Sequence, residues 1–173
     1  MSFSIRATIR GFVAPDHRLT CPSALWRGLL HELRRRGRGR FESGAFLLGR
    51  VSGKRRRIES VAYYDDLDPE ALLTGIVVFE GRGYGPLWAL CRETDRIVVA
   101  DVHTHGGVAR QSSLDRDNPM IATAGHLAII VPGFADGRIQ LSDLGIYEYE
   151  GAHRWRDLSG PGARRYFYVG LWG

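Results

Sequence analysis

The sequence predicts an α/β protein with a mixed β-sheet flanked by helices. Short apolar runs bounded by turn residues indicate buried strands, as in the run that ends at Gly49. Apolar residues at helical spacing after Ser23 indicate one helix, and Gly85-Pro86 marks the start of a second. Strands with two or three helices among them are typical of a layered α/β fold rather than of a bundle or a barrel.

The first half of the chain contains a helix and a pair of strands. Ser23 is placed to cap the helix, because its hydroxyl can accept a hydrogen bond from a free amide of the first turn. The arginines at 34–36 fall in the last turn, where the helix dipole favours positive charge. We expect a strand over 4–12, a loop through Pro15 and Pro22, a helix from Ser23 to about Arg36, and strands over 41–49 and 58–64 with a turn at Ser52-Gly53 between them.

The second half contains the most apolar runs, at 97–100 and 126–131, which indicate buried strands. Pro86 suits the first turn of a helix, because that turn does not need its amide hydrogen. We expect an acidic loop or short helical turn over 65–73, strands over 75–79, 97–105, 126–131, 144–149 and 154–158, a helix from Gly85 to about Glu93, the end of a helix over 121–125, and a last strand or docked tail over 166–172.

Length and composition indicate one domain over residues 1–173, large enough to bury a substantial core. No apolar run approaches the roughly 20 residues that cross a bilayer, and the N-terminus lacks the apolar core of a signal peptide. The two cysteines, Cys21 and Cys91, are far apart and lack CxxC spacing, which favours small core residues in a reducing compartment. We therefore expect a cytoplasmic protein with no membrane association.

The net charge of +5 comes almost wholly from arginine, since Lys54 is the only lysine. The arginines gather at 34–40 and 55–57, and neither cluster is interleaved with aromatic residues as a base-stacking surface is. The arginine codons of a GC-rich genome are a sufficient explanation for this excess. Binding to nucleic acid is therefore not favoured.

Two histidines follow the apolar run at 97–100. In an extended strand His103 and His105 point to the same side, so that both imidazoles can bind one ion. Asp115 follows ten residues after His105. Two histidines and a carboxylate form a ligand set for a catalytic zinc ion with an open fourth position.

A zinc site that hydrolyses an amide also needs a group that moves protons between the attacking water and the leaving amine. Glu42 is the best candidate, because it stands at the start of an apolar strand, where a charge has little structural reason to be.

These residues occur in the order of a known pattern. Glu42 precedes the Gly-bounded apolar run GAFLLG, His103-Thr104-His105 follows at a distance, and Ser112-x-x-Asp115 comes next. Over roughly residues 23–150 the chain thus resembles the JAMM metallopeptidases, also called the JAB or MPN-domain family.

The resemblance implies an MPN/JAB-like fold with layers similar to those of cytidine deaminases. It implies that His103, His105 and Asp115 bind Zn²⁺, that Glu42 is the general acid and base, and that Ser112 hydrogen-bonds the oxyanion. It further implies a deubiquitinase-like peptidase or isopeptidase that cuts at the C-terminus of a ubiquitin-like protein. As a compact, stand-alone domain, the chain is similar to the family members encoded beside bacterial ubiquitin-like conjugation systems, including antiphage ones. This similarity implies E1- and E2-like enzymes as partners.

The loop after the second histidine departs from the family pattern. Gly106 replaces the usual proline, and the loop to Ser112 is one residue shorter, which the flexible pair Gly106-Gly107 can absorb. Ser113 with Asp117 is a poorer alternative pair, because its spacing is one residue too long.

Alternatives remain for each part of the pattern. Taken alone, Ser112-x-x-Asp115 could be a helix capping box, and the two histidines could be hydrogen-bonded residues at a strand end. The whole chain could be a non-catalytic MPN scaffold or a nucleic-acid-associated protein of the same fold. A nucleobase deaminase is excluded, because the His-x-Glu and Pro-Cys-x-x-Cys motifs are missing. The remaining histidines are expected to be structural: His17, His31, His126 and His153.

Overall fold

The computed structural model describes residues 17–171, and within them eight strands form one mixed sheet in the order β7-β6-β5-β4-β2-β3-β1-β8. β1 pairs in parallel with β3 and β8, β4 pairs in parallel with β5, and the other neighbours are antiparallel. The strands are β1 (Leu19–Pro22), β2 (Gly44–Ser52), β3 (Arg55–Tyr63), β4 (Ile97–Thr104), β5 (Leu127–Val131), β6 (Gly145–Gly151), β7 (Arg154–Asp157) and β8 (Phe167–Gly170). The expected α/β class is confirmed.

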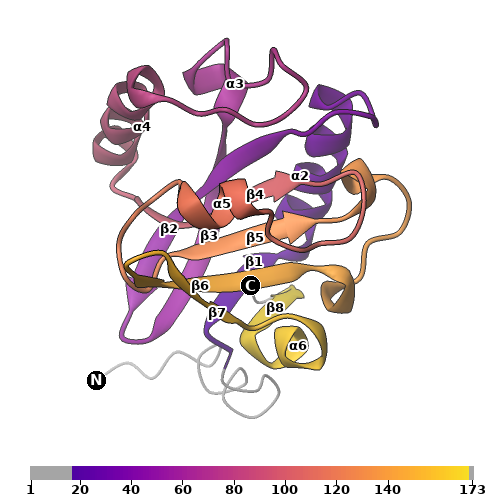
Figure 1. The fold of residues 1–173 in the computed structure, drawn as a ribbon. Coiled ribbons are helices and arrows are strands. Elements are labelled where there is room, and N and C mark those ends of the chain that lie inside the picture. Colours follow the sequence, from indigo (N-terminus) through magenta and orange to yellow (C-terminus); the bar gives the residue numbers. More distant parts are fainter. Residues whose placement is uncertain (1–16, 172–173) are drawn as a thin grey trace.

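Helices lie on opposite sides of the β2–β3 hairpin, as Figure 1 shows. The helices are α2 (Ser23–Arg36), α3 (Tyr64–Leu67), α4 (Gly81–Thr94), α5 (Ser113–Asp117) and α6 (Ala163–Tyr166). Alternation along β2 sends Ala45 and Leu47 into the core with α2, and Phe46 and Leu48 into the core with α4. The sheet is therefore buried on both faces in this region, which accounts for the unbroken apolar run in the sequence.

β4 lies in the middle of the sheet, between β2 and β5. Its central residues are buried, and it ends at Thr104, beside the first residues of β2. In the β2–β4 pairing Gly44 lies opposite His103, so the start of one strand meets the end of the other. This register brings Glu42, just before β2, to the same edge as the two histidines.

Most elements lie where the sequence predicts them. The helix over 23–36 and the strands around 44–52, 55–63, 97–104, 127–131, 145–151 and 154–157 are present, with ends shifted by a few residues. The C-terminal segment is a strand, β8, preceded by α6. Both cysteines are buried in the cores, as expected, and burial raises the pKa of Cys21 to about 12.

The start of α2 differs from the prediction. Pro22 occupies the N-cap position, no side chain caps the helix, and Ser23 is its first residue. The predicted loop through Pro22 is also wrong, because 19–22 form β1 between β3 and β8. Proline is tolerated at this strand end, where its missing amide hydrogen is not needed. The predicted strand over 4–12 lies outside the described residues.

Three further elements differ. Residues 75–79 form a bend and a loop rather than a strand, because the amides of Val77 and Val78 bond to Glu42 and Ala71. α4 begins at Gly81, four residues early, where Phe79 packs against Gly83. Residues 121–125 form turns rather than a helix end, since the Gly125 amide bonds to Tyr149 across the sheet.

None of the helices within residues 17–171 is long and apolar enough to cross a bilayer.

Candidate metal centre

His103 and His105 lie at the end of β4 with their rings on one side. Their Nε2 atoms are 3.0 Å apart, and His103 is almost fully buried. The backbone around them is fixed from both neighbouring strands: the Thr104 amide donates to the Ser43 carbonyl, and the His105 amide donates to the Val131 carbonyl. The prediction from strand alternation, that both imidazoles share one face, is confirmed.

Asp115 approaches the two histidines from α5. Its Oδ1 lies 3.4 Å from Nε2 of His103, and its Oδ2 lies 3.3 Å from Nε2 of His105. Ser112 caps α5, accepting the Asp115 amide at 3.1 Å, and both its amide and its hydroxyl donate to Asp115 Oδ2, at 2.7 and 2.9 Å. The capping box thus exists, and it holds the carboxylate of Asp115 toward the histidines.

The three side chains fit a small divalent cation. Their ligand atoms all lie within 4.8 Å of one another. In the part of the chain that the structure describes, these three residues form a group that could hold a metal ion. Ligands about 2.0 to 2.1 Å from a tetrahedral zinc ion would be roughly 3.3 Å apart. The observed separations of 3.0, 3.4 and 3.3 Å are close to this spacing.

The charges in this cluster stabilise one another. Burial alone would lower the pKa of His103, but the hydrogen bond and negative charge of Asp115 outweigh it and raise that pKa above 6.5. For Asp115 burial acts upward, yet the hydrogen bonds from His103 and His105 bring its pKa well below its usual range. Asp115 is therefore a carboxylate at any physiological pH, as a metal ligand must be.

Glu42 faces the cluster from the start of β2. Its Oε2 accepts the amide of Val77 at 3.1 Å, and its own amide donates to the carbonyl of Gly75 at 3.0 Å. Its Oε1 lies 4.0 Å from Nε2 of His105. The loop that replaces the predicted strand over 75–79 thus orients this carboxylate, a role that the sequence did not reveal.

These residues line one open pocket of about 560 Å³. Apolar side chains at its rim are partly exposed, among them Ile76, Val108 and Leu114. The pocket is lined by Glu42, Ile76, Val77, His103, His105, Gly106, Gly107, Val108, Arg110, Ser112, Leu114, Asp115 and Met120. The candidate metal ligands and Glu42 thus border a single pocket.

The structure distinguishes the two possible pairs in the loop. Asp115, and not Asp117, joins the histidines in the metal-binding group found among residues 17–171. The structure also explains why glycine occupies position 106: a Cβ there would lie 2.5 Å from the ring of Phe134. A larger residue at this position would meet the same ring.

The Arg34–Arg36 part of the first arginine cluster has structural partners. Arg36 stacks over the ring of Tyr63 at 4.0 Å. The ion pairs are Arg34 with Asp136, Arg35 with Glu32, and Arg36 with Asp65 and Asp66. These pairs account for the arginines at the end of α2 without a nucleic-acid partner.

His126, expected to be structural, is paired with a buried carboxylate that sequence reasoning missed. Its Nε2 lies 2.6 Å from Oδ1 of Asp101, and both side chains are buried. The sequence did hold a signal for Asp101, because alternation along β4 places it on the same face as His103.

No family model matches the chain. Among solved structures it is similar to the solution structure of protein DSY2949 from Desulfitobacterium hafniense, with a TM-score of 0.61, 17% sequence identity, and coverage of 87% of this chain and 92% of that one. At this identity the similarity establishes a shared fold and leaves the activity to be argued from the site.

Proposed function

We propose that the chain is a zinc-dependent peptidase or isopeptidase of the JAMM type, with the layers of an MPN/JAB domain. The observation that carries this proposal is the convergence of His103, His105 and Asp115 near the end of β4, with Glu42 facing them from the segment just before β2. A purely structural metal site needs only its ligands. A site that hydrolyses amides also needs an acid beside them that transfers protons, and Glu42 is in that position.

Hydrolysis of an amide requires two proton transfers. A water loses a proton as its oxygen adds to the carbonyl carbon, and the leaving nitrogen gains a proton as the C–N bond breaks. Glu42 can accept the first proton on Oε1 and return it to the nitrogen, because its Oε2 is already held by the Val77 amide. A zinc ion held by the three ligands would supply a Lewis acid that lowers the pKa of a water from about 15.7 to about 7.

Ser112 is the proposed donor to the oxyanion. Its hydroxyl lines the pocket but donates to Asp115 in this structure, so the oxyanion role requires that the O–H turn toward the substrate. The Ser112 amide continues to hold Asp115 after that rotation.

The proposed substrate is the C-terminal tail of a ubiquitin-like protein, alone or joined to a target. The open pocket with apolar rim residues suits an extended tail whose last carbonyl reaches the ligands. E1- and E2-like enzymes of a bacterial, cytoplasmic conjugation pathway, such as an antiphage one, are the proposed partners.

The test combines metal analysis with cleavage. We expect about one zinc ion per chain after exposure to zinc, and release of aminomethylcoumarin from a fluorogenic amide of the ubiquitin tail. Glu42→Gln should retain zinc and lose cleavage, whereas Glu93→Gln, on the exposed face of α4, should retain both.

Each outcome is decisive for one part of the proposal. A wild-type chain that binds no zinc overturns the metal centre. Cleavage by Glu42→Gln at the wild-type rate overturns the role of Glu42. Zinc binding without cleavage of the fluorogenic amide or of lysine-linked diubiquitin supports a scaffold in place of a peptidase.

A further inference from the structure

Asp101 is a buried carboxylate on the metal-binding face of β4. It lies two residues before His103, so that both side chains project to the same side of the strand. Its side chain is only 1% exposed, and Oδ1 accepts the Nε2–H of His126 at 2.6 Å. Such a charge in a central strand needs further hydrogen bonds to offset the loss of solvation.

Three buried polar atoms gather on this face without a partner. Among the described residues, Oδ2 of Asp101, Nδ1 of His103 and the hydroxyl of Tyr64 have no partner at full hydrogen-bond geometry, and the Tyr64 hydroxyl lies near the Asp101 carboxylate. A buried polar group without a partner destabilises the fold, so three such atoms on one face call for an explanation beyond folding. One of them is an acceptor, one is a hydroxyl donor, and one is the imidazole nitrogen that is not aimed at the other metal ligands.

Tyr64 covers the strands at this point. Its ring lies 4.9 Å from that of Phe46, and a Cβ on Gly44 would lie 2.3 Å from it. Phe46 is opposite Asp101 and Gly44 is opposite His103 in the β2–β4 register. Tyr64 therefore spans the residues opposite Asp101 and His103. Burial, followed by the charge of Asp101, raises the pKa of Tyr64, which keeps its hydroxyl a donor.

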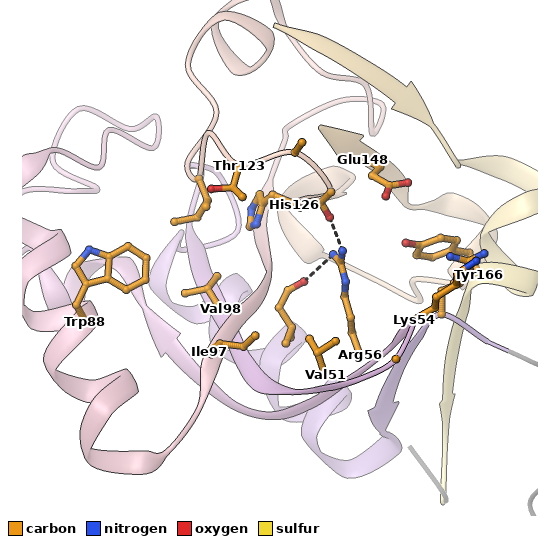
Figure 2. Close-up of a pocket in the computed structure, with 16 residues that line it drawn as sticks. Val51, Lys54, Arg56, Trp88, Ile97, Val98, Thr123, His126, Glu148 and Tyr166 are labelled. Atoms are coloured by element: carbon orange, nitrogen blue, oxygen red, sulfur yellow. Dashed lines mark hydrogen bonds between the residues drawn. The ribbon is translucent and has the colours of Figure 1, made fainter. Parts of the chain in front are cut away.

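The backbone around His126 is fixed by hydrogen bonds. Figure 2 shows Arg56 donating to two backbone carbonyls, of which one belongs to Gly125 at 2.5 Å and the other to Val99 at 3.3 Å. The amide of Tyr149 donates to the His126 carbonyl at 2.8 Å. His126 itself borders a second cavity of about 480 Å³, and Asp101 lies behind it.

We propose that Asp101 is a positioning residue for the metal centre: with an ion on Nε2 of His103, its Oδ2 accepts the Nδ1–H of His103, a bond that this structure does not contain, while His126 holds Oδ1. The bond to Nδ1 fixes the tautomer in which Nε2 of His103 carries a lone pair toward the ion. The inference rests on the metal centre of the proposed function but not on peptidase activity. Carboxylates that orient metal-binding histidines are worth about 10- to 100-fold in metal affinity.

The test measures the dissociation constants of Zn²⁺ and Co²⁺ and the visible absorption of the Co²⁺ form. Asp101→Asn is expected to weaken binding about 10-fold and Asp101→Ala about 100-fold, with a changed Co²⁺ spectrum. The control is Val99→Ala, which removes buried apolar atoms of the same strand from the core on the α2 side. The control should lose stability and keep the wild-type affinity and spectrum.

A pair of His126 variants tests the second contact. His126→Gln places an amide donor near the position of Nε2 and should restore most of the affinity that His126→Phe loses. Equal affinities for wild type, Asp101→Asn and Asp101→Ala would overturn the inference and leave the metal centre standing. Absence of metal binding in the wild type would overturn both.

A measurement on the wild type serves if the Asp101 variants fail to fold. In the zinc-loaded chain, long-range ¹H–¹⁵N spectra should show His103 protonated at Nδ1, with slow exchange of that proton with water. An unprotonated Nδ1, or one in fast exchange, overturns the inference.

Discussion

Nε2 of His103 and Nε2 of His105 lie 3.0 Å apart, with the carboxylate of Asp115 against both. Two lone pairs at this distance repel unless a proton or a cation lies between them. A proton and a metal ion therefore compete for one position, and the stability of the chain should depend on pH in opposite ways with and without zinc.

Without metal, the unfolding free energy should fall as pH rises from about 6 to about 8. The pKa of His103 is raised from 6.5, so its contribution is complete below that value and is lost as pH rises through the folded pKa. The lowered pKa of Asp115 contributes above 3.8 and does not change in this range. With saturating zinc the free energy should instead rise, because only neutral imidazoles bind the ion.

Denaturant unfolding in EDTA and in zinc checks this prediction. Asp115→Asn is the control, since it removes the partner that raises the pKa of His103 and should flatten the slope in EDTA. Parallel slopes in EDTA and zinc would contradict a shared site.

Ser112 variants separate its two roles. Ser112→Ala should cost about 1 kcal/mol of stability, because the N-cap of α5 is lost, whereas Ser112→Gly should cost only a few tenths. Both lack the hydroxyl, and loss of an oxyanion donor slows cleavage by about 100- to 1,000-fold. Thermal unfolding and cleavage rates of both variants separate the two roles. If Ser112→Gly cleaves faster than Ser112→Ala, in line with its higher stability, the hydroxyl acts only as a helix cap.

Gly75→Ala should impair cleavage without removing the metal. Gly75 has φ +85°, and a Cβ would lie 2.9 Å from the ring of Phe41, next to Glu42. Its carbonyl accepts the Glu42 amide, so its displacement should move the carboxylate and slow cleavage about 10- to 100-fold. The control is Gly53→Ala in the β2–β3 turn, where φ is +59° and nothing lies within 4 Å.

Both substitutions should cost about 1 to 2 kcal/mol for the left-handed backbone. Only Gly75→Ala should change the cleavage rate at saturating zinc. Equal rates for the two variants would show that the loop does not position Glu42.

Gly106→Ala should destabilise the chain by about 1 to 3 kcal/mol, because its Cβ meets the ring of Phe134. The amide of Phe134 donates to the His105 carbonyl at 2.8 Å, so zinc affinity should fall as well. Adding Phe134→Ala makes room for the new Cβ. The double variant should then lose less stability than the two single variants together, by about 0.5 kcal/mol or more. Additive effects in denaturant unfolding would contradict the contact.

Much of this molecule follows from local patterns in the sequence. Alternation along β4 predicts that His103 and His105 share a face, and the spacing of Ser112 and Asp115 predicts the capping box that orients the carboxylate. These features involve residues within one strand or one helical turn, where backbone geometry decides which side chains meet.

The remaining features depend on pairing between distant segments. Glu42 reaches the histidines through the register that places Gly44 opposite His103, and no local pattern fixes a register. The contact of Asp101 with His126 likewise depends on the parallel pairing of β4 with β5. Residues 75–79 have the composition of a strand, but a turn and the Glu42 carboxylate take up their amides.

All three metal ligands fall within 103–115, whereas Glu42 arrives through the β2–β4 pairing. Displacement of Glu42 alone would therefore stop the proposed cleavage while the three candidate ligands stay together. Metal content would then be a poor measure of the active fraction of a preparation, and a partner that displaces Glu42 would stop the proposed cleavage without releasing a bound zinc ion.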